Sequence, residues 1–195
     1  SSTSGSFDLL DALGLPVELD GEAVARCVAD AGIGFCFARS FHPAMRHAGP
    51  VRAELGVPTV FNILGPLSHP ARVQRQVIGV GDASVAARVA GVLAARGVTR
   101  AWVVRGSDGL DELTTTGAST VLDVHDGEVH EYEVHPAEVG LAVASPDALA
   151  GGGPEENEAL FARLLAGEAG AVRDIVALNA AAALVVGGVA DDLAA

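Results

Sequence analysis

Apolar residues in the first part of the chain follow a helical spacing and then form a continuous run. Between Asp20 and Gly32 they recur at the i, i+3, i+4, i+7 spacing of one helix face, with Asp20 as a candidate N-cap and Gly32 as a candidate C-cap. An uncharged run at residues 33–38 follows and predicts a strand. A short helix is also expected near residues 8–13.

The middle of the chain repeats the helix and strand patterns. Residues 75–80 and 101–104 predict strands, and the helical pattern at 84–96 lies between them and ends at Gly97. Strands that alternate with helices usually pair in parallel and are covered on both faces. The sequence therefore predicts an α/β fold with a mostly parallel central sheet and helices on both faces.

The last part of the chain predicts a hairpin and two helices. Two β-rich pieces flank Asp126 and Gly127, a pair typical of tight hairpin turns. Helices are expected at 154–166 and 171–186. The second belongs to an uncharged stretch whose only polar side chain is Asn179 and which is shorter than the ~20 residues of a membrane span. It therefore predicts a buried, alanine-rich helix.

Composition narrows the possible functions. Of 195 residues, 25 are acidic and 12 are Lys or Arg, for a formal net charge of −13, and all twelve are arginine. The absence of lysine excludes Schiff-base chemistry and a P-loop lysine, and the acidic balance argues against binding to nucleic acid or an anionic membrane. The length favours one domain, residues 1–195. Cys27 and Cys36 are expected as reduced core residues of a cytoplasmic protein without a signal peptide.

The clearest candidate site is the pair Asp111 and Glu112. The two acids follow the predicted strand at 101–104 in the glycine-containing sequence DGLDE, and ligands of open parallel sheets bind outside the carboxyl ends of strands. Adjacent carboxylates supply the oxygen donors that Mg²⁺ prefers. The same short motif also occurs in solvated turns, so the spacing alone leaves both interpretations open.

The opening sequence, SSTSGS, is a second candidate site. Small hydroxyl side chains and exposed backbone N–H groups before a helix favour phosphate oxygens. The alternative is a solvated N-cap loop.

A local basic cluster at residues 42–52 is the third candidate. His42 and His47 are five residues apart and do not share a helix face, which argues against a zinc pair. Arg52 either pairs with Glu54 or presents its planar guanidinium to a carboxylate ligand.

Six motifs together resemble one known family. They are SSTSGSFDLLDALG, HPAM, VRAELGVPTVFNILGPL, GSDGLDELTTTG, GGGPEEN and RDIVALNAAAAL. In register from Ser1 to Ala195, the chain resembles the large α/β domain of the anthranilate phosphoribosyltransferase family. The resemblance implies a magnesium-dependent homodimer of tryptophan biosynthesis that transfers the phosphoribosyl group of phosphoribosyl pyrophosphate to the amine of anthranilate. It implies an oxocarbenium-like transition state without a covalent nucleophile.

The resemblance also implies roles for individual residues. Asp111 and Glu112 would hold the Mg²⁺ that accompanies the pyrophosphate leaving group. Arg52 matches the arginine that meets the anthranilate carboxylate, and His42 would line the channel through which anthranilate enters. The phosphate-binding residues would be the serines Ser1, Ser2 and Ser6.

The chain departs from the family pattern at several points. The family's GTGGD, NxST and KHGN segments and most of its small helical domain would precede Ser1, so we expect both ends to be cut and the fragment alone to be inactive. Residues 42–68 would normally pack on that small domain and should expose apolar surface. Arg105 stands where the family commonly has histidine, Thr3 where a basic residue is usual, and Phe7 where alanine is usual.

Two other functions remain open from the sequence. A pyrimidine nucleoside phosphorylase shares the overall fold, but its lysine-bearing loop has no counterpart in a chain without lysine. A non-catalytic, nucleic-acid-binding paralogue would need a basic stripe, which the acidic composition argues against.

Overall fold

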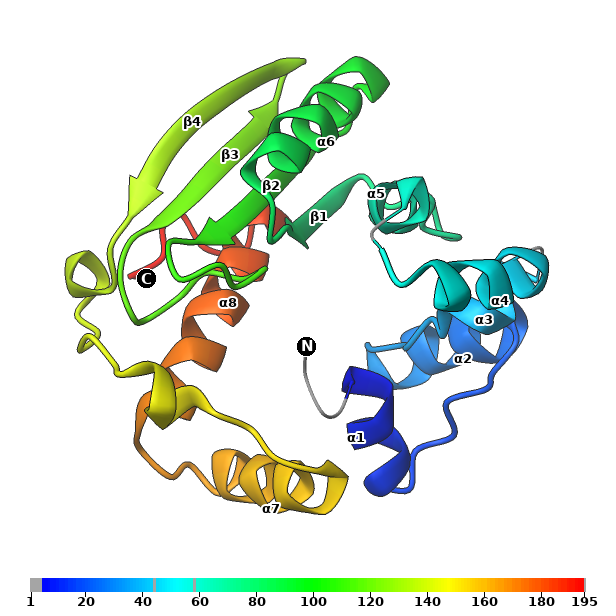
Figure 1. The fold of residues 1–195 in the computed structure, drawn as a ribbon. Coiled ribbons are helices and arrows are strands. Elements are labelled where there is room, and N and C mark those ends of the chain that lie inside the picture. Colours follow the sequence, from blue (N-terminus) through cyan, green and yellow to red (C-terminus); the bar gives the residue numbers. More distant parts are fainter. Residues whose placement is uncertain (1–4, 44, 58, 195) are drawn as a thin grey trace. The chain divides into compact units, whose positions relative to one another are not determined.

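The computed structural model describes residues 5–43, 45–57 and 59–194 (Figure 1), with the backbone alone described at 45, 46, 52, 53 and 62. Two compact units are distinguished. The helical unit comprises Ser1–Ala71 and Gly151–Arg163, and the sheet unit comprises Arg72–Ala150 and Leu164–Ala195. No helix among the described residues is both long enough and apolar enough to cross a membrane. The prediction of a single domain stays a prediction, and each unit is described by itself.

The helical unit contains short helices joined by loops. They are α1 (Ser6–Ala12), α2 (Gly21–Ala31), α3 (Ala38–Phe41), α4 (Met45–Leu55), α5 (Val60–Leu67) and most of α7 (Pro154–Leu165). Asp20 caps α2 by accepting a hydrogen bond from the Ala23 N–H at 2.8 Å. Gly32 ends the helix with φ 77°, in the left-handed region. Both predicted caps of this helix are confirmed.

The strand predicted at residues 33–38 is wrong. Residues 33–37 have no regular structure, and Ala38 already belongs to α3. The segment packs against α2, because a Cβ placed on Gly34 would lie 2.8 Å from the Val28 side chain and 3.1 Å from the Val24 carbonyl. A strand needs a neighbouring strand for its backbone hydrogen bonds, and every described strand belongs to the sheet unit.

The sheet unit contains four strands in the order β1-β2-β3-β4. The strands are β1 (Arg75–Gly79), β2 (Arg100–Gly106), β3 (Ser119–His125) and β4 (Glu128–Val134). The predicted α/β class is confirmed, but the sheet is mixed and not mostly parallel. Only β1 and β2 pair in parallel, and β3 is antiparallel to both of its neighbours. The loop between β2 and β3 contains no helix that could return the chain for a parallel strand.

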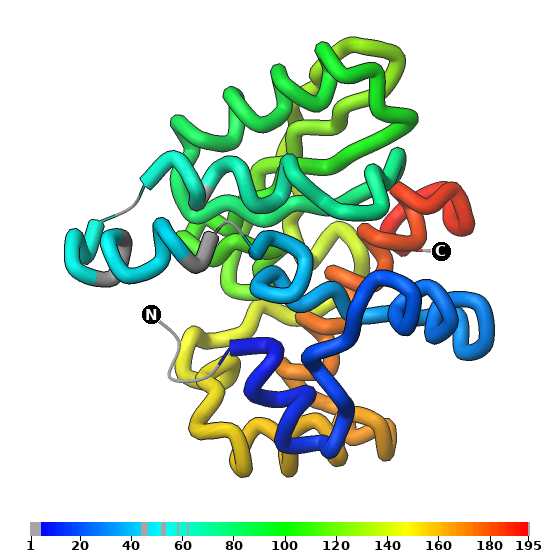
Figure 2. Tube along the Cα trace, turned by 90° about the vertical axis from the view of Figure 1, so that its right-hand side faces the viewer, coloured from blue at the N-terminus to red at the C-terminus, as the bar shows by residue number. Residues whose placement is uncertain are grey.

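The predicted hairpin and the helices on both faces of the sheet are confirmed. Asp126 and Gly127 have φ values of 53° and 77° at the β3–β4 turn. Helix α6 (Ala83–Arg96) contacts β2, β3 and β4 and lies beside the hairpin (Figure 2). Trp102 and Val104 pack in one core with α8 (Ala171–Gly187). Because side chains alternate along a strand, Ala101 and Val103 of β2 are buried on the opposite face.

Candidate functional site

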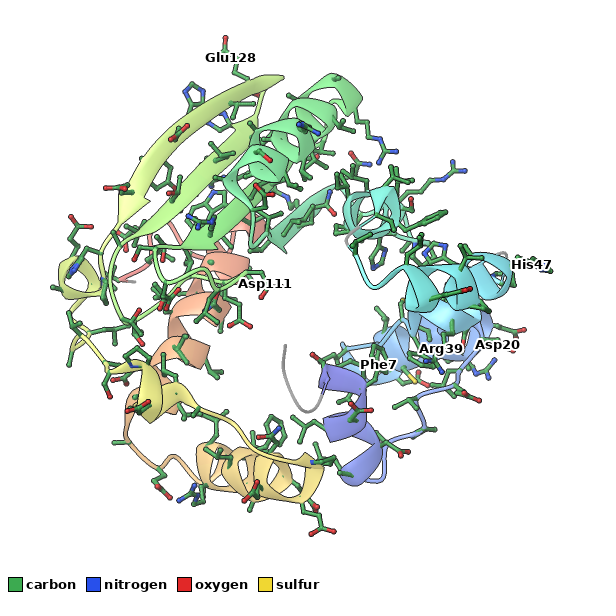
Figure 3. The ribbon with its side chains drawn as sticks, in the orientation of Figure 1. Phe7, Asp20, Arg39, His47, Asp111 and Glu128 are labelled. Atoms are coloured by element: carbon green, nitrogen blue, oxygen red, sulfur yellow. The ribbon has the colours of Figure 1, made fainter. Side chains whose placement is uncertain are left out.

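Asp111 and Glu112, from here on the acidic pair, lie in the loop between β2 and β3 (residues 107–118). Figure 3 labels Asp111 in this loop. The loop passes directly over the end of β1, because a Cβ placed on Gly79 would collide with the Asp111 carbonyl. The predicted position of the acidic pair, after the carboxyl end of the strand that is now β2, is confirmed, and the structure adds that the pair also lies at the end of β1. It also explains why β1 ends on a glycine.

Asp108 organises the loop from within. Its Oδ2 accepts hydrogen bonds from the hydroxyls of Thr114 and Thr116, each at 2.6 Å, and its Oδ1 accepts from the Leu110 N–H at 3.1 Å. Partial burial would raise the pKa of Asp108, but these hydrogen bonds together lower it below its usual value. Asp108 is thus an ionised acceptor that holds the loop, a role that the sequence motif alone did not reveal.

Asn179 of α8 holds the middle of the loop, directly after the acidic pair. Its Oδ1 accepts from the Leu113 N–H at 3.0 Å, and its Nδ2 donates to the Leu113 carbonyl at 2.8 Å and to the Ile175 carbonyl at 3.0 Å. The only sequence signal for this contact was a single polar side chain within an apolar stretch.

The electrostatics of the acidic pair fit a divalent cation. Partial burial, and then the charge of Asp111, raise the pKa of Glu112. Among the described residues neither carboxylate has a hydrogen bond or an ion pair, and no cluster of three or more metal-binding side chains is present. Mg²⁺ is commonly held by one or two carboxylates together with water and substrate phosphates. The donor set therefore fits Mg²⁺ bound jointly with a phosphate ligand.

The serine site lies at the start of the helical unit. Ser1, Ser2 and Thr3 lie outside the described residues. Ser6 is the exposed first residue of α1. The Asp8 carboxylate accepts a hydrogen bond from the Gly5 N–H at 2.7 Å and occupies part of this helix end. Phosphate binding by these serines stays a prediction.

His42 lines a cavity of about 900 Å³ in the helical unit. Its walls combine apolar side chains, such as Phe61 and Leu64, with Arg39, and are formed by residues of α3, α4 and α5 and of their connections. Ligand pockets of roughly this size commonly combine apolar walls with a few polar groups. The side chain of Arg52, on α4, lies outside the described residues.

Two of the departures from the family pattern have clear contacts. Arg105 donates from Nε to the Gly81 carbonyl at 3.0 Å, which ties β2 to the turn after β1. Phe7 packs against Phe37 with 4.6 Å between ring centroids. Arg105 is therefore held by a hydrogen bond within the sheet unit, and Phe7 by ring packing within the helical unit.

The candidate residues fall into two groups. Asp111 and Glu112 share one loop of the sheet unit, whereas Ser6 and His42 belong to the helical unit. That the two groups form one substrate site stays a prediction.

The sequence and the fold of this chain agree with those of known proteins. The family described as "Glycosyl transferase family, a/b domain" matches residues 1–195, so the chain belongs to this glycosyl transferase family. Within the family, the chain is 50% identical over 193 residues to an anthranilate phosphoribosyltransferase of Azorhizobium caulinodans, covering 99% of this chain and 56% of the relative. The resemblance seen in the sequence motifs is therefore confirmed.

Solved structures show the same likeness. An anthranilate phosphoribosyltransferase from Thermus thermophilus superposes with a TM-score of 0.90 at 49% identity, covering 97% of this chain and 56% of that chain. The Saccharomyces cerevisiae enzyme in complex with PRPP and Mg superposes with a TM-score of 0.88 at 27% identity, over 97% of this chain and 55% of that one. The chain thus spans just over half the length of these proteins.

Proposed function

We propose that the polypeptide carrying this chain transfers the phosphoribosyl group from phosphoribosyl pyrophosphate to anthranilate and releases pyrophosphate, as a step of tryptophan biosynthesis. The observation that carries the proposal is the unpartnered acidic pair, held at the carboxyl ends of β1 and β2 in a chain 50% identical to an anthranilate phosphoribosyltransferase. No finding favours the nucleoside phosphorylase or nucleic-acid-binding alternatives.

In this proposal the chain acts mainly through positioning and charge. Asp111 and Glu112 hold Mg²⁺, whose positive charge, when bound, offsets the negative charge of the pyrophosphate leaving group. Ser1, Ser2 and Ser6 contribute to phosphate binding, and the serine hydroxyls and backbone N–H groups act as donors. The amine of anthranilate attacks the ribose C1, and both substrates must be held in line for this displacement.

The acceptor side of the proposed site lies in the helical unit. Arg52 binds the anthranilate carboxylate through its guanidinium fork, and His42 lines the path of the aromatic ring, beside the apolar walls of its cavity. We further propose that the complete protein is a cytoplasmic homodimer in which residues 42–68 pack on a small helical domain.

The direct test of the proposal is removal of the acidic pair's charge in the complete polypeptide. Asp111→Asn combined with Glu112→Gln should keep the fold and lower turnover by about a hundredfold or more, the loss typical of removing one preorganised electrostatic group. The matched control is Asp191→Asn with Asp192→Asn, because these are also adjacent exposed acids. Activity should rise with added Mg²⁺ in the control and respond weakly in the test variant. Equal activity of both variants across a magnesium titration would contradict the proposal.

A further inference from the structure

The segment that carries the acidic pair is fixed on its N-terminal side. Both backbone groups of Leu110 are hydrogen-bonded: its N–H donates to Asp108 Oδ1 at 3.1 Å, and its carbonyl accepts from the Gly106 N–H at 2.9 Å. The end of β2 and the Asp108 carboxylate therefore define where the acidic pair begins.

The same segment is fixed on its C-terminal side by a different element. Leu113 is fully buried, and both of its backbone groups bond to the side chain of Asn179 at 3.0 and 2.8 Å. Because water does not reach Leu113, no solvent molecule can replace these bonds unless the loop moves. Only the two residues of the acidic pair lie between the fixed positions of Leu110 and Leu113.

Helix α8, which carries Asn179, is itself anchored to the sheet. Arg75 donates to the Val186 carbonyl at 2.6 Å, and Arg100 donates to the Val185 carbonyl at 3.3 Å. Arg100 is oriented by Asp123, with 2.8 Å between Nη2 and Oδ2. The arginines at the start of β1 and β2 thus donate hydrogen bonds to the last carbonyls of α8. The carboxyl ends of the same two strands lie at the acidic pair. Asn179 therefore projects from a helix that cannot slide along the sheet without losing these bonds.

We propose that Asn179 is a positioning residue that sets the geometry of the acidic pair through the backbone of Leu113. The inference rests on the proposed function of the acidic pair. Groups that orient metal ligands without touching the metal typically change metal affinity or activity by about 10- to 100-fold when they are removed. A leucine at this position has the same branching and the same number of side-chain heavy atoms, but it neither donates nor accepts a hydrogen bond, so it removes the clamp with little change in side-chain shape.

The first experiment measures metal binding in the complete protein. Mn²⁺ titrated together with inorganic pyrophosphate, and followed by electron paramagnetic resonance, reports binding without any reaction. Asn179→Leu should weaken Mn²⁺ binding about 10- to 100-fold, and Asn179→Gln, which retains the amide, should restore part of the loss. In steady-state assays Asn179→Leu should lower kcat and raise the KM for phosphoribosyl pyrophosphate while the KM for anthranilate changes little.

The second experiment separates positioning from general stability. The control is Val185→Ala, which removes buried packing from the same helix and leaves the Leu113 bonds in place. Amide hydrogen exchange of Leu113 in the metal-free protein should become faster in Asn179→Leu and not in Val185→Ala. Unchanged exchange at Leu113, or equal losses of Mn²⁺ affinity in the two variants, would overturn the positioning role. A different pair of results would overturn the proposed function instead. In that case Leu113 exchanges faster in Asn179→Leu, but the wild-type protein binds no Mn²⁺ in the presence of pyrophosphate.

Should Asn179→Leu fail to fold, Asn179→Ala offers the same test with a smaller side chain. It removes the same three hydrogen bonds. If the amide exchange rate of Leu113 in Asn179→Ala equals that of the wild type, the positioning role of Asn179 is likewise overturned.

Discussion

The sheet unit and the helical unit differ sharply in how much of their apolar surface is buried. Nearly all described buried apolar residues lie in the sheet unit, including Leu93, Leu113 and Val124, each with 0% exposure. In the described part of the helical unit, Val24 and Leu67 are the only buried apolar residues, each with 7% exposure. The helical unit instead exposes large apolar side chains on α4 and α5, such as Leu55 at 57%.

This difference shows that the two units reach their structure by different means. The sheet unit buries a two-sided core and can hold the loop of the acidic pair rigidly. The described residues of the helical unit form no comparable core, so much of their apolar surface is available to another part of the polypeptide. The predicted exposure of apolar residues within 42–68 is confirmed, whereas its cover by a small helical domain stays a prediction.

The largest expected effect is loss of activity in a polypeptide of these 195 residues alone. The sheet unit should remain folded, with slow amide exchange in its strands, while the helical unit exchanges faster. No phosphoribosyl transfer should be detected, because the chain spans just over half the length of the enzymes it resembles. Circular dichroism checks that the chain is folded, hydrogen exchange compares the two units, and a transfer assay checks for activity. Substantial turnover, or equal protection in both units, would break the comparison.

Truncating a leucine in each unit measures the difference in burial between the units as a change in the free energy of unfolding. Leu93→Ala should lower the free energy of unfolding by about 2–5 kcal/mol, because the residue is fully buried. Leu55→Ala, at an exposed position, should cost less than about 1 kcal/mol in the 195-residue chain. In the complete protein the cost of Leu55→Ala should be larger if the proposed small helical domain covers Leu55. Denaturant unfolding of both variants in both polypeptides checks this, and equal costs in the short chain would contradict it.

Arg52 tests whether the helical unit selects the acceptor. A hydrogen bond to a charged group is worth about 1.5–3 kcal/mol, so Arg52→Ala in the complete protein should raise the anthranilate KM roughly 10- to 100-fold. The KM for phosphoribosyl pyrophosphate should change far less, and Arg52→Lys should restore activity only in part. Arg26→Ala is the control, because Arg26 makes an exposed pair with Glu22 at 3.1 Å. Equal changes in KM for both substrates, or no change in either, would show that Arg52 has a structural role and does not select the acceptor.

Asp108 tests the rigidity of the sheet unit's loop, and its substitution should have a small effect on stability. Its pKa is lowered from 3.8 in the folded protein, so the stabilisation it provides is present above that value and is lost as the pH falls through the lowered pKa. Asp108→Asn should therefore cost about 1 kcal/mol at neutral pH, since solvent screens part of each hydrogen bond. The difference from wild type should shrink below about pH 4. Thermal unfolding from pH 7 to pH 3 checks this, and a difference independent of pH would contradict it.

Features that depend on a few neighbouring residues could be predicted from the sequence. The caps of α2 at Asp20 and Gly32 and the β3–β4 turn at Asp126 and Gly127 are confirmed, because each is decided by side chains and φ preferences within one turn. The position of the acidic pair also follows from local order, since a loop after a strand must lie at that strand's carboxyl end.

What depended on distant partners could not be predicted in this way. Residues 33–37 are apolar enough for a strand, but without a neighbouring strand they pack on α2 instead. The direction of β3 depended on a loop that has no helix. A mostly parallel sheet was therefore expected, and a mixed one formed.

The sequence by itself determined the caps of α2, the β3–β4 turn and which two acids lie at the end of β2, because these choices rest on local conformational preferences. Only the tertiary structure decided how those acids are held. Asn179 is separated by 66 positions from Leu113, and Gly79 meets Asp111 although β1 and this loop are far apart in the chain. Hydrogen bonds and backbone contacts of this kind depend on angstrom-scale distances, which the packing of α8 and β1 sets and which no local pattern encodes.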